Sequence, residues 1–590
     1  MKSLSYLNKY FFKYKWHLLL GVVFILGSNF LHINMPLIVK DAVNQFEAEF
    51  DLDNWLNVAL KLGGFYILLS LGKGVFLFFT RQTIIKVSRY IEFDLKNEIY
   101  GQYQRLNYNF YKKNSTGDLM NRISEDVSKV RMYLGPGVMY TVNLVILFAF
   151  ILYSMLSINV ELTLYTLTPL PLMSYLVYKV SSTMNRQSER VQREQSKIST
   201  IVQESFSGIT VLKAYSGEKI FQEKFDKSAD NYLKKQMDLV KTNALFMPTI
   251  TFLIGLSTVL TIYLGGILSF EAQNNITNGD IVAFIFYVNM LTWPFASVGW
   301  VTSLIQRAAA SQERINEFLK EKPQVNNPTT APFHFQGRIL FKNVSYTFPT
   351  SGIAAIKNLS FEINKGETLA ILGRTGSGKS TIINLVMRQF DPTSGEIMID
   401  DQNLKAINIA DFRKQTGIVP QEVFLFSDSI KNNVKFGLAE NNDCSENEII
   451  EILKTAHVYH NIQDFDKGLE TLLGERGVNL SGGQKQRLSI ARALIRKPKF
   501  LILDDCLSAV DTDTEEIILK NIKNQIEKNT TLIISHRVSS IRNADRILVL
   551  DDGEKIEEGT HDELLQLNGV YADMYNKQLV EELEKKKAKK

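Results

Sequence analysis

Five stretches in the first half of the chain contain no Asp, Glu, Lys or Arg, and they constrain the fold more than any other feature of the sequence. They cover residues 16–39, 132–160, 162–178, 242–270 and 281–306. A helix needs about 20 mostly apolar residues to cross a bilayer. A sixth candidate, residues 56–80, contains only Lys61 and Lys73 as charged residues. We therefore predict six membrane-spanning helices, at about residues 16–39, 56–80, 135–158, 161–180, 243–268 and 281–304.

The Lys and Arg residues beside these stretches predict the orientation of the chain. Four lysines precede the first stretch, and segments 81–131 and 179–241 contain ten and twelve Lys or Arg residues. The intervening loops on the other side, about 40–53 and 269–280, contain one Lys or Arg residue between them, Lys40. Positively charged segments next to spans stay on the cytoplasmic side. We therefore place both termini in the cytoplasm and predict that 81–131 and 179–241 form long cytoplasmic helical hairpins.

The composition changes after residue 320. Pro323, Pro328 and Pro332 interrupt a polar stretch that is typical of a linker. Beyond it, short β-branched patterns alternate with helical ones, which indicates an α/β domain. We predict a transmembrane domain over residues 1–320, a linker over 321–338, an α/β domain over 339–578 and a basic tail over 579–590.

A phosphate-binding loop stands near the start of the α/β domain. The sequence GRTGSGKS, residues 373–380, follows a predicted strand and precedes a helical run. Its glycines let backbone amides surround phosphate oxygens, and the helix N-terminus adds partial positive charge. Lys379 would reach the β- and γ-phosphates, and the Ser380 hydroxyl would bind Mg²⁺. The predicted nucleotide contacts here are Gly373, Arg374, Thr375, Gly376, Ser377, Gly378, Lys379, Ser380 and Thr381.

Two further motifs suit the same chemistry. The apolar strand FLIL ends in Asp504 and Asp505, and carboxylates beside a phosphate loop can bind Mg²⁺ and orient an attacking water. The motif LSGGQ, residues 480–484, opens a helical run. A helix cap would need Ser481 alone, so the two glycines favour a second anion site.

These motifs together resemble the ATP-binding cassette (ABC) exporters of the half-transporter kind, in which six spans are fused to one nucleotide-binding domain. The resemblance implies adenine stacking on Phe348, where the family usually has tyrosine, and a Mg²⁺-sensing role for Gln421. It also implies a switch role for His536, a dimer contact at SAVD (508–511) and a loop at GERG (474–477). Segments 110–127 and 205–218 resemble the coupling regions of the two hairpins. The signature residues that bind the nucleotide of a second subunit are Ser481, Gly482, Gly483 and Gln484.

One position departs from the family pattern. Asp505 stands where these transporters normally have the catalytic glutamate. A carboxylate shortened by one methylene lies about 1.5 Å further back, and a misplacement of about 1 Å can cost on the order of 100-fold in rate. We therefore expect ATP to bind and hydrolysis at this site to be slow. Aspartate here is similar to one subunit of heterodimeric exporters, so we favour a second, different half-transporter as partner, and a homodimer stays open.

The resemblance implies ATP-driven export of amphiphilic compounds, drugs or lipids, with ATP and Mg²⁺ as cofactors, across the cell inner membrane. Two alternatives stay open: a regulatory subunit whose partner supplies most turnover, and an importer on the same scaffold. A net charge of +5 gives no reason to expect nucleic-acid binding, and two cysteines exclude a disulfide framework. Lys73, inside the second span, could meet a substrate, although snorkelling or pairing is the commoner use of such a lysine.

Overall fold

The computed structural model describes residues 2–48, 55–270, 276–349, 351–438, 444–474, 477–525 and 529–588. The chain forms two compact units. The helical unit comprises Met1–Arg105 and Ser115–Glu321, and the nucleotide unit comprises Leu106–Asn114 and Lys322–Lys590. The predicted order, helices first and an α/β domain second, is confirmed.

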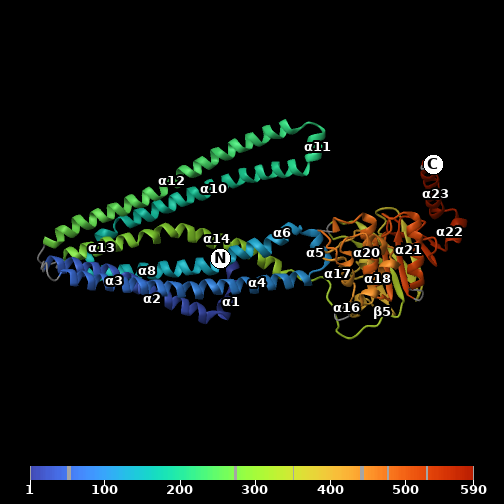
Figure 1. The fold of residues 1–590 in the computed structure, drawn as a ribbon, viewed down its shortest axis with the longest axis horizontal. Helices are drawn as coiled ribbons and strands as arrows, with labels where there is room; N and C mark the ends of the chain where they lie inside the picture. Colours follow the sequence, from blue (N-terminus) through green and yellow to red (C-terminus); the bar gives the residue numbers. More distant parts are fainter. Residues whose placement is uncertain are drawn as a thin grey trace. The chain divides into compact units, whose positions relative to one another are not determined.

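Long helices make up the helical unit (Figure 1). Among the described residues, five helical segments are long and apolar enough to cross a membrane: Lys15–Glu47, Leu56–Arg105, Thr116–Ile158, Glu218–Phe270 and Asn278–Lys320. The remaining predicted span, residues 161–180, is divided between two helices, because α9 (Val160–Leu167) ends just before Pro169, the first residue of α10 (Pro169–Ser207). Proline lacks a backbone N–H and is accommodated best in the first helical turn.

The hairpin over 179–241 is built from α10, α11 (Ile209–Ala214) and α12 (Glu218–Phe270). Figure 1 shows α10 and α12 side by side with α11 at their far end. The two helices have 39 and 53 residues, which correspond to lengths of roughly 58 and 80 Å. Each therefore exceeds the thickness of the bilayer core and extends well beyond it. The other helices described in this unit are η1 (Lys2–Leu7), α1 (Asn8–Lys13), α2 (Lys15–Ala48), α3 (Trp55–Thr80), α4 (Lys86–Arg105), α6 (Thr116–Asn121), α7 (Val127–Met132), α8 (Val138–Ile158), α13 (Asn278–Met290) and α14 (Thr292–Lys320). Three short π-helical turns, η2 (Arg81–Ile85), η3 (Arg122–Asp126) and η4 (Tyr133–Gly137), lie between them.

Two sheets form the nucleotide unit. The first is antiparallel, in the order β2-β1-β4-β5, and the second has the order β10-β9-β3-β8-β7-β6. In the second sheet β9, β3, β8, β7 and β6 are parallel, and their central strands are buried apolar runs, as expected for a sheet covered on both faces. The strands are β1 (Ile339–Thr347), β2 (Ala354–Ile363), β3 (Thr368–Gly373), β4 (Ser394–Ile399), β5 (Gln402–Asn403), β6 (Thr416–Val419), β7 (Phe500–Asp504), β8 (Thr530–Ser535), β9 (Arg546–Asp551) and β10 (Glu554–Gly559).

Short helices surround these sheets. They are α5 (Tyr108–Lys113), α15 (Lys379–Val386), α16 (Ile409–Lys414), α17 (Ile430–Lys435), α18 (Glu446–Thr455), α19 (Tyr459–Gln463), η5 (Gly468–Glu470), α20 (Gly482–Leu494), α21 (Thr512–Gln525), α22 (His561–Leu567) and α23 (Val570–Ala588). The stretch predicted as a linker packs onto this unit, since Phe333 and Phe335 are buried in its core. A short piece of the first hairpin, Leu106–Asn114, also belongs to it.

Candidate nucleotide-binding site

Four neighbouring parallel strands deliver the predicted catalytic residues to one edge of the sheet. The strands β3, β8, β7 and β6 are adjacent in that order. Gly373 ends β3, and Asp504 ends β7, where it pairs in register with Ile534 of β8. His536 and Gln421 follow β8 and β6 within two residues. Because ligands of open α/β sheets bind at the carboxyl ends of the strands, this edge is the expected position for a nucleotide.

The phosphate loop has the backbone that its glycines predict. Gly376 and Gly378 have φ values of +89° and +98°, a left-handed region that side chains disfavour. A Cβ atom on Gly378 would also lie 2.3 Å from the carbonyl oxygen of Ala355. Only glycine therefore allows the turn that leads directly into α15, whose free N–H groups face the loop.

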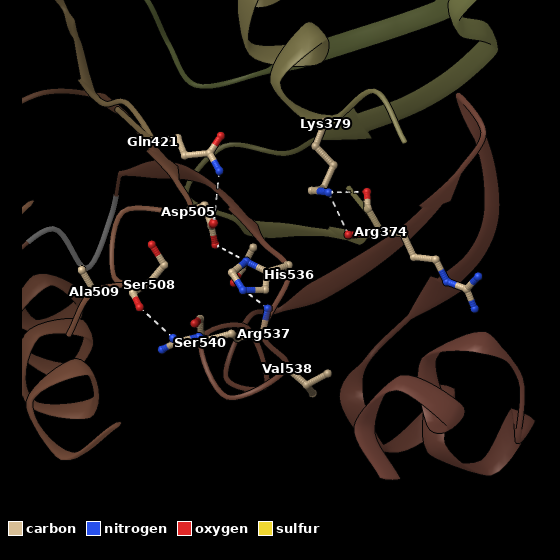
Figure 2. Close-up of polar contacts among 12 residues, drawn as sticks. Arg374, Lys379, Gln421, Asp505, Ser508, Ala509, His536, Arg537, Val538 and Ser540 are labelled. Carbon is tan, nitrogen blue, oxygen red and sulfur yellow. Dashed lines mark hydrogen bonds and ion pairs between the residues drawn. The ribbon is translucent and has the colours of Figure 1, made fainter. Parts of the chain in front are cut away.

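Lys379 is held within the loop. Its Nζ donates hydrogen bonds to the carbonyl oxygens of Gly373 (2.7 Å) and Arg374 (2.8 Å) (Figure 2). Burial lowers the pKa of Lys379, and the nearby Asp505 and Asp504 carboxylates partly oppose that shift. Polyphosphate oxygens brought to this loop could replace the two carbonyl acceptors and supply the negative charge that favours the ammonium form.

The residues proposed for Mg²⁺ lie together at the end of β7. Burial raises the pKa of Asp504 to about 6, and the nearby Ser380 hydroxyl partly opposes that shift. The described residues contain no group of three or more His, Cys, Asp or Glu side chains that could hold a metal alone. One carboxylate, one hydroxyl and the phosphates of a nucleotide are the ligand set that Mg²⁺ commonly uses, so these residues fit that ion.

Asp505 lies at the centre of a short polar network. Its Oδ1 is 2.7 Å from Nδ1 of His536, and its Oδ2 is 3.5 Å from Nε2 of Gln421. Figure 2 shows Gln421 and His536 pointing toward Asp505 from different sides. The residue has a left-handed φ of +46°, and its N–H donates to the carbonyl oxygen of Ile534. Aspartate tolerates this conformation better than most residues.

The signature loop caps helix α20 and also lies close to the 508–511 loop. Ser481 Oγ accepts from the N–H of Gln484, and Gln484 Oε1 accepts from the N–H of Ser481, which forms a capping box at the start of α20. A Cβ atom on Gly483 would lie 3.0 Å from the carbonyl oxygen of Ala509. Glycine there permits close approach of the 508–511 loop, a reason that the sequence alone did not show. Both capping bonds join Ser481 to Gln484 and so stay within the signature loop.

Phe348 is half-buried in an aromatic cluster. Tyr346 and Phe390 meet its ring edge to face, at interplanar angles of 84° and 81°. Lys112 of α5 lies over the Phe348 ring with Nζ 5.2 Å from the centroid. The ring is therefore fixed by residues of β1, of the segment after α15 and of α5.

Sequence reasoning missed two side chains that shape the site. Gln486 donates to Ser508 Oγ and accepts from the N–H of Ala509, so it ties the signature helix to the 508–511 loop. Gln578, from α23, bonds the backbone on either side of Arg537. Neither residue lies in a motif that sequence analysis could have singled out. In the GERG loop, Glu475 and Arg476 lie outside the described residues.

Comparisons with known proteins agree with this geometry. Residues 18–295 match the family described as the ABC transporter transmembrane region, and residues 356–508 match the family described as ABC transporter. A probable multidrug resistance ABC transporter ATP-binding/permease protein, YheI of Bacillus subtilis (strain 168), is 34% identical over 96% of each chain. This chain belongs to the ABC transporter family. The ATP-dependent lipid A-core flippase of Coxiella burnetii (strain RSA 493 / Nine Mile phase I) is 32% identical over 95% of this chain and 94% of its own.

A solved structure of a bacterial Atm1-family ABC exporter with ATP bound is also similar. Its TM-score is 0.80 at 26% identity, over 96% of this chain and 98% of that one. The expected membership in the ABC family and the expected fold class are thereby confirmed: a helical transmembrane domain followed by a P-loop ABC nucleotide-binding domain. Membership in the family also implies that the nucleotide unit binds ATP.

Proposed function

We propose that this chain is one half of a dimeric ABC exporter that uses ATP hydrolysis to move amphiphilic compounds, drugs or lipids, out of the cytoplasm. The observation that carries the proposal is the convergence of Lys379, Asp504, Asp505 and His536 at one sheet edge in a chain that also has membrane-spanning helices. The names of the similar multidrug and lipid transporters support the substrate class. We place the chain in the cell inner membrane with both termini in the cytoplasm.

Each residue then has a defined task at the ATP site. The P-loop amides and Lys379 bind the β- and γ-phosphates, and Phe348 stacks on the adenine. Ser380, Asp504 and Gln421 would hold Mg²⁺, which neutralises phosphate charge when bound. Asp505 accepts a proton from the attacking water, and His536, hydrogen-bonded to Asp505, orients that carboxylate. The signature residues Ser481–Gln484 bind the nucleotide held by the opposite chain and so complete its site.

A transport assay tests this function. Inside-out vesicles, whose nucleotide-binding domains face the medium, should take up a fluorescent cationic amphiphile when MgATP is added. Lys379→Ala should abolish the uptake. Equal uptake by Lys379→Ala vesicles would refute ATP-driven transport, and ATP-driven movement in the opposite direction would indicate an importer.

A second candidate function rests on Asp505. Its carboxylate is one methylene shorter than glutamate, and the structure pairs it with His536. In a heterodimer this site would retain ATP as a clamp, while the intact LSGGQ would serve a partner that carries glutamate. Steady-state ATPase of the chain alone discriminates the two arrangements. A rate clearly above that of Lys379→Ala indicates a competent homodimer, and a rate equal to it with intact ATP binding indicates a slow site that needs a partner.

A further inference from the structure

The loop that carries His536 is hydrogen-bonded through its backbone to helix α23. The Nε2 of Gln578 donates to the carbonyl oxygen of His536 at 2.8 Å, and its Oε1 accepts from the N–H of Val538 at 2.8 Å. One amide side chain therefore bonds the backbone on both sides of Arg537. The His536 side chain extends from the same loop to Asp505 (Figure 2).

Gln578 is presented by a firmly anchored helix. Tyr571, in the first turn of α23, is fully buried, and its N–H donates to a carboxylate oxygen of Glu557 on β10. Its hydroxyl lies 2.6 Å from Nδ1 of His561, at the start of α22. Gln578 is seven residues beyond Tyr571, which is close to two helical turns, so both side chains lie on the same face of α23.

The two bonds demand an amide. Only a side chain with a donor and an acceptor in one plane can satisfy a carbonyl and an N–H at once, and glutamine provides both. Leucine would satisfy neither group, and an ionised glutamate could not donate to the carbonyl of His536. The adjacent contact, from Arg537 Nη2 to the carbonyl oxygen of Ser508 at 2.7 Å, fixes the loop toward the 508–511 segment but not toward α23.

We propose that Gln578 is a positioning residue for His536, so that the C-terminal helix sets the geometry of the switch loop during ATP hydrolysis. The inference rests on the proposed function, because it assigns His536 a role at the ATP site. Gln578 itself touches neither substrate nor reacting atoms. Its effect passes through the backbone of residues 536–538 to the imidazole and from there to Asp505.

The first test measures His536 without depending on ATP turnover. The full-length chain in lipid is treated with diethyl pyrocarbonate, and mass spectrometry follows the modification rate of each histidine. Gln578→Leu should change the rate at His536 severalfold and leave His334 unchanged as an internal reference. Asn576→Leu, which removes an exposed amide two residues earlier and on a different face of α23, is the matched control and should change neither rate. An unchanged His536 rate in Gln578→Leu would overturn the proposal.

The second test uses kinetics and a double-mutant cycle. Gln578→Leu should lower kcat on the order of tenfold, the scale expected when hydrogen bonds that hold a reacting group are lost. It should leave the affinity for MgATP unchanged, and it should add nothing to the loss caused by His536→Ala, because both changes act through one side chain. A full additional tenfold loss in the His536→Ala background would indicate a general structural effect and refute the proposal.

The failure of the proposed function has a different signature. If the unmodified chain and Lys379→Ala hydrolyse ATP at the same rate, the kinetic test is run in an Asp505→Glu background, and the modification test still decides the role of Gln578. If Gln578→Leu changes the His536 modification rate but the chain shows no ATP-dependent transport, the role of Gln578 stands and the exporter function is refuted. If the His536 rate is unchanged in Gln578→Leu but the chain transports with ATP, the exporter function stands and the role of Gln578 is refuted.

Discussion

The replacement Asp505→Glu tests the reasoning about the hydrolytic site most directly. In the structure the Asp505 carboxylate is 12% exposed and bonds His536 at 2.7 Å. Glutamate would place its carboxylate about 1.5 Å further from the backbone. Since a misplacement of about 1 Å can change a rate on the order of 100-fold, Asp505→Glu should raise kcat by about 10- to 100-fold.

The backbone conformation adds a cost that the assay can separate. Asp505 has a φ of +46°, and glutamate lacks the short polar side chain that eases this region. The strain is present both before and during hydrolysis, so it lowers stability by about 1 kcal/mol without lowering kcat. We therefore expect a slightly lower Tm and a faster enzyme in the same variant.

Steady-state ATPase of the purified chain in lipid measures the effect, with Lys379→Ala and Asp505→Asn as blanks. The slow-site argument predicts that the unmodified chain lies near the blanks and Asp505→Glu well above them. It would be refuted if the unmodified chain clearly exceeded both blanks and Asp505→Glu did not exceed it. In that case the shorter carboxylate already reaches the attacking water, and a homodimer needs no partner with glutamate.

Three further outcomes follow from the nucleotide unit. Protonation of Asp504, whose pKa is raised to about 6, should weaken Mg²⁺-dependent ATP binding as pH falls through about 6, and higher Mg²⁺ should move the midpoint to lower pH, as titration calorimetry can show; a midpoint independent of Mg²⁺ would contradict this. Lys112→Met removes the cation over the Phe348 ring and should weaken the binding of ATP by about two- to fivefold. The binding of tripolyphosphate, which has no base to stack, should be unchanged. The matched change Lys113→Met should affect the binding of neither ligand. N-ethylmaleimide at pH 8 should label Cys444 and spare Cys506, because burial raises the pKa of the Cys506 thiol; rapid labelling of Cys506 in the folded protein would show that the strand end opens.

The motifs that the sequence predicted are those whose chemistry is local. The phosphate loop needs a strand, a glycine-rich turn and a helix that follow one another directly, and residues 368–386 supply all three. Asp504 and Asp505 were predictable for the same reason, since two carboxylates directly after an apolar run mark the end of a buried strand. Their partners His536 and Gln421 came from the family resemblance, because parallel pairing of distant strands is not visible in one sequence.

The contacts that were not predicted depend on tertiary approach. Gln486 reaches the 508–511 loop across 22 and 23 residues, and Gln578 reaches His536 across 42. The polar stretch before residue 339 read as a linker because its prolines exclude a helix, yet Phe333 and Phe335 belong to the core. The division at Pro169 was likewise hidden, because an apolar run predicts burial in a bilayer but not where the helix is interrupted.

The hydrogen bonds around residue 508 suggest how a second chain would affect hydrolysis. Ser508 receives Gln486 of the signature helix at its hydroxyl and Arg537 at its carbonyl. Arg537 is the residue that follows His536, and Gln578 holds the backbone on both sides of it. A partner that pressed on the 508–511 loop would therefore move the signature helix and the switch loop together, unless Gln578 held the latter in place. We accordingly expect Gln578→Leu to lower the ATPase rate more in the assembled dimer than in the chain alone, because the partner then contacts the loop whose neighbour Gln578 holds.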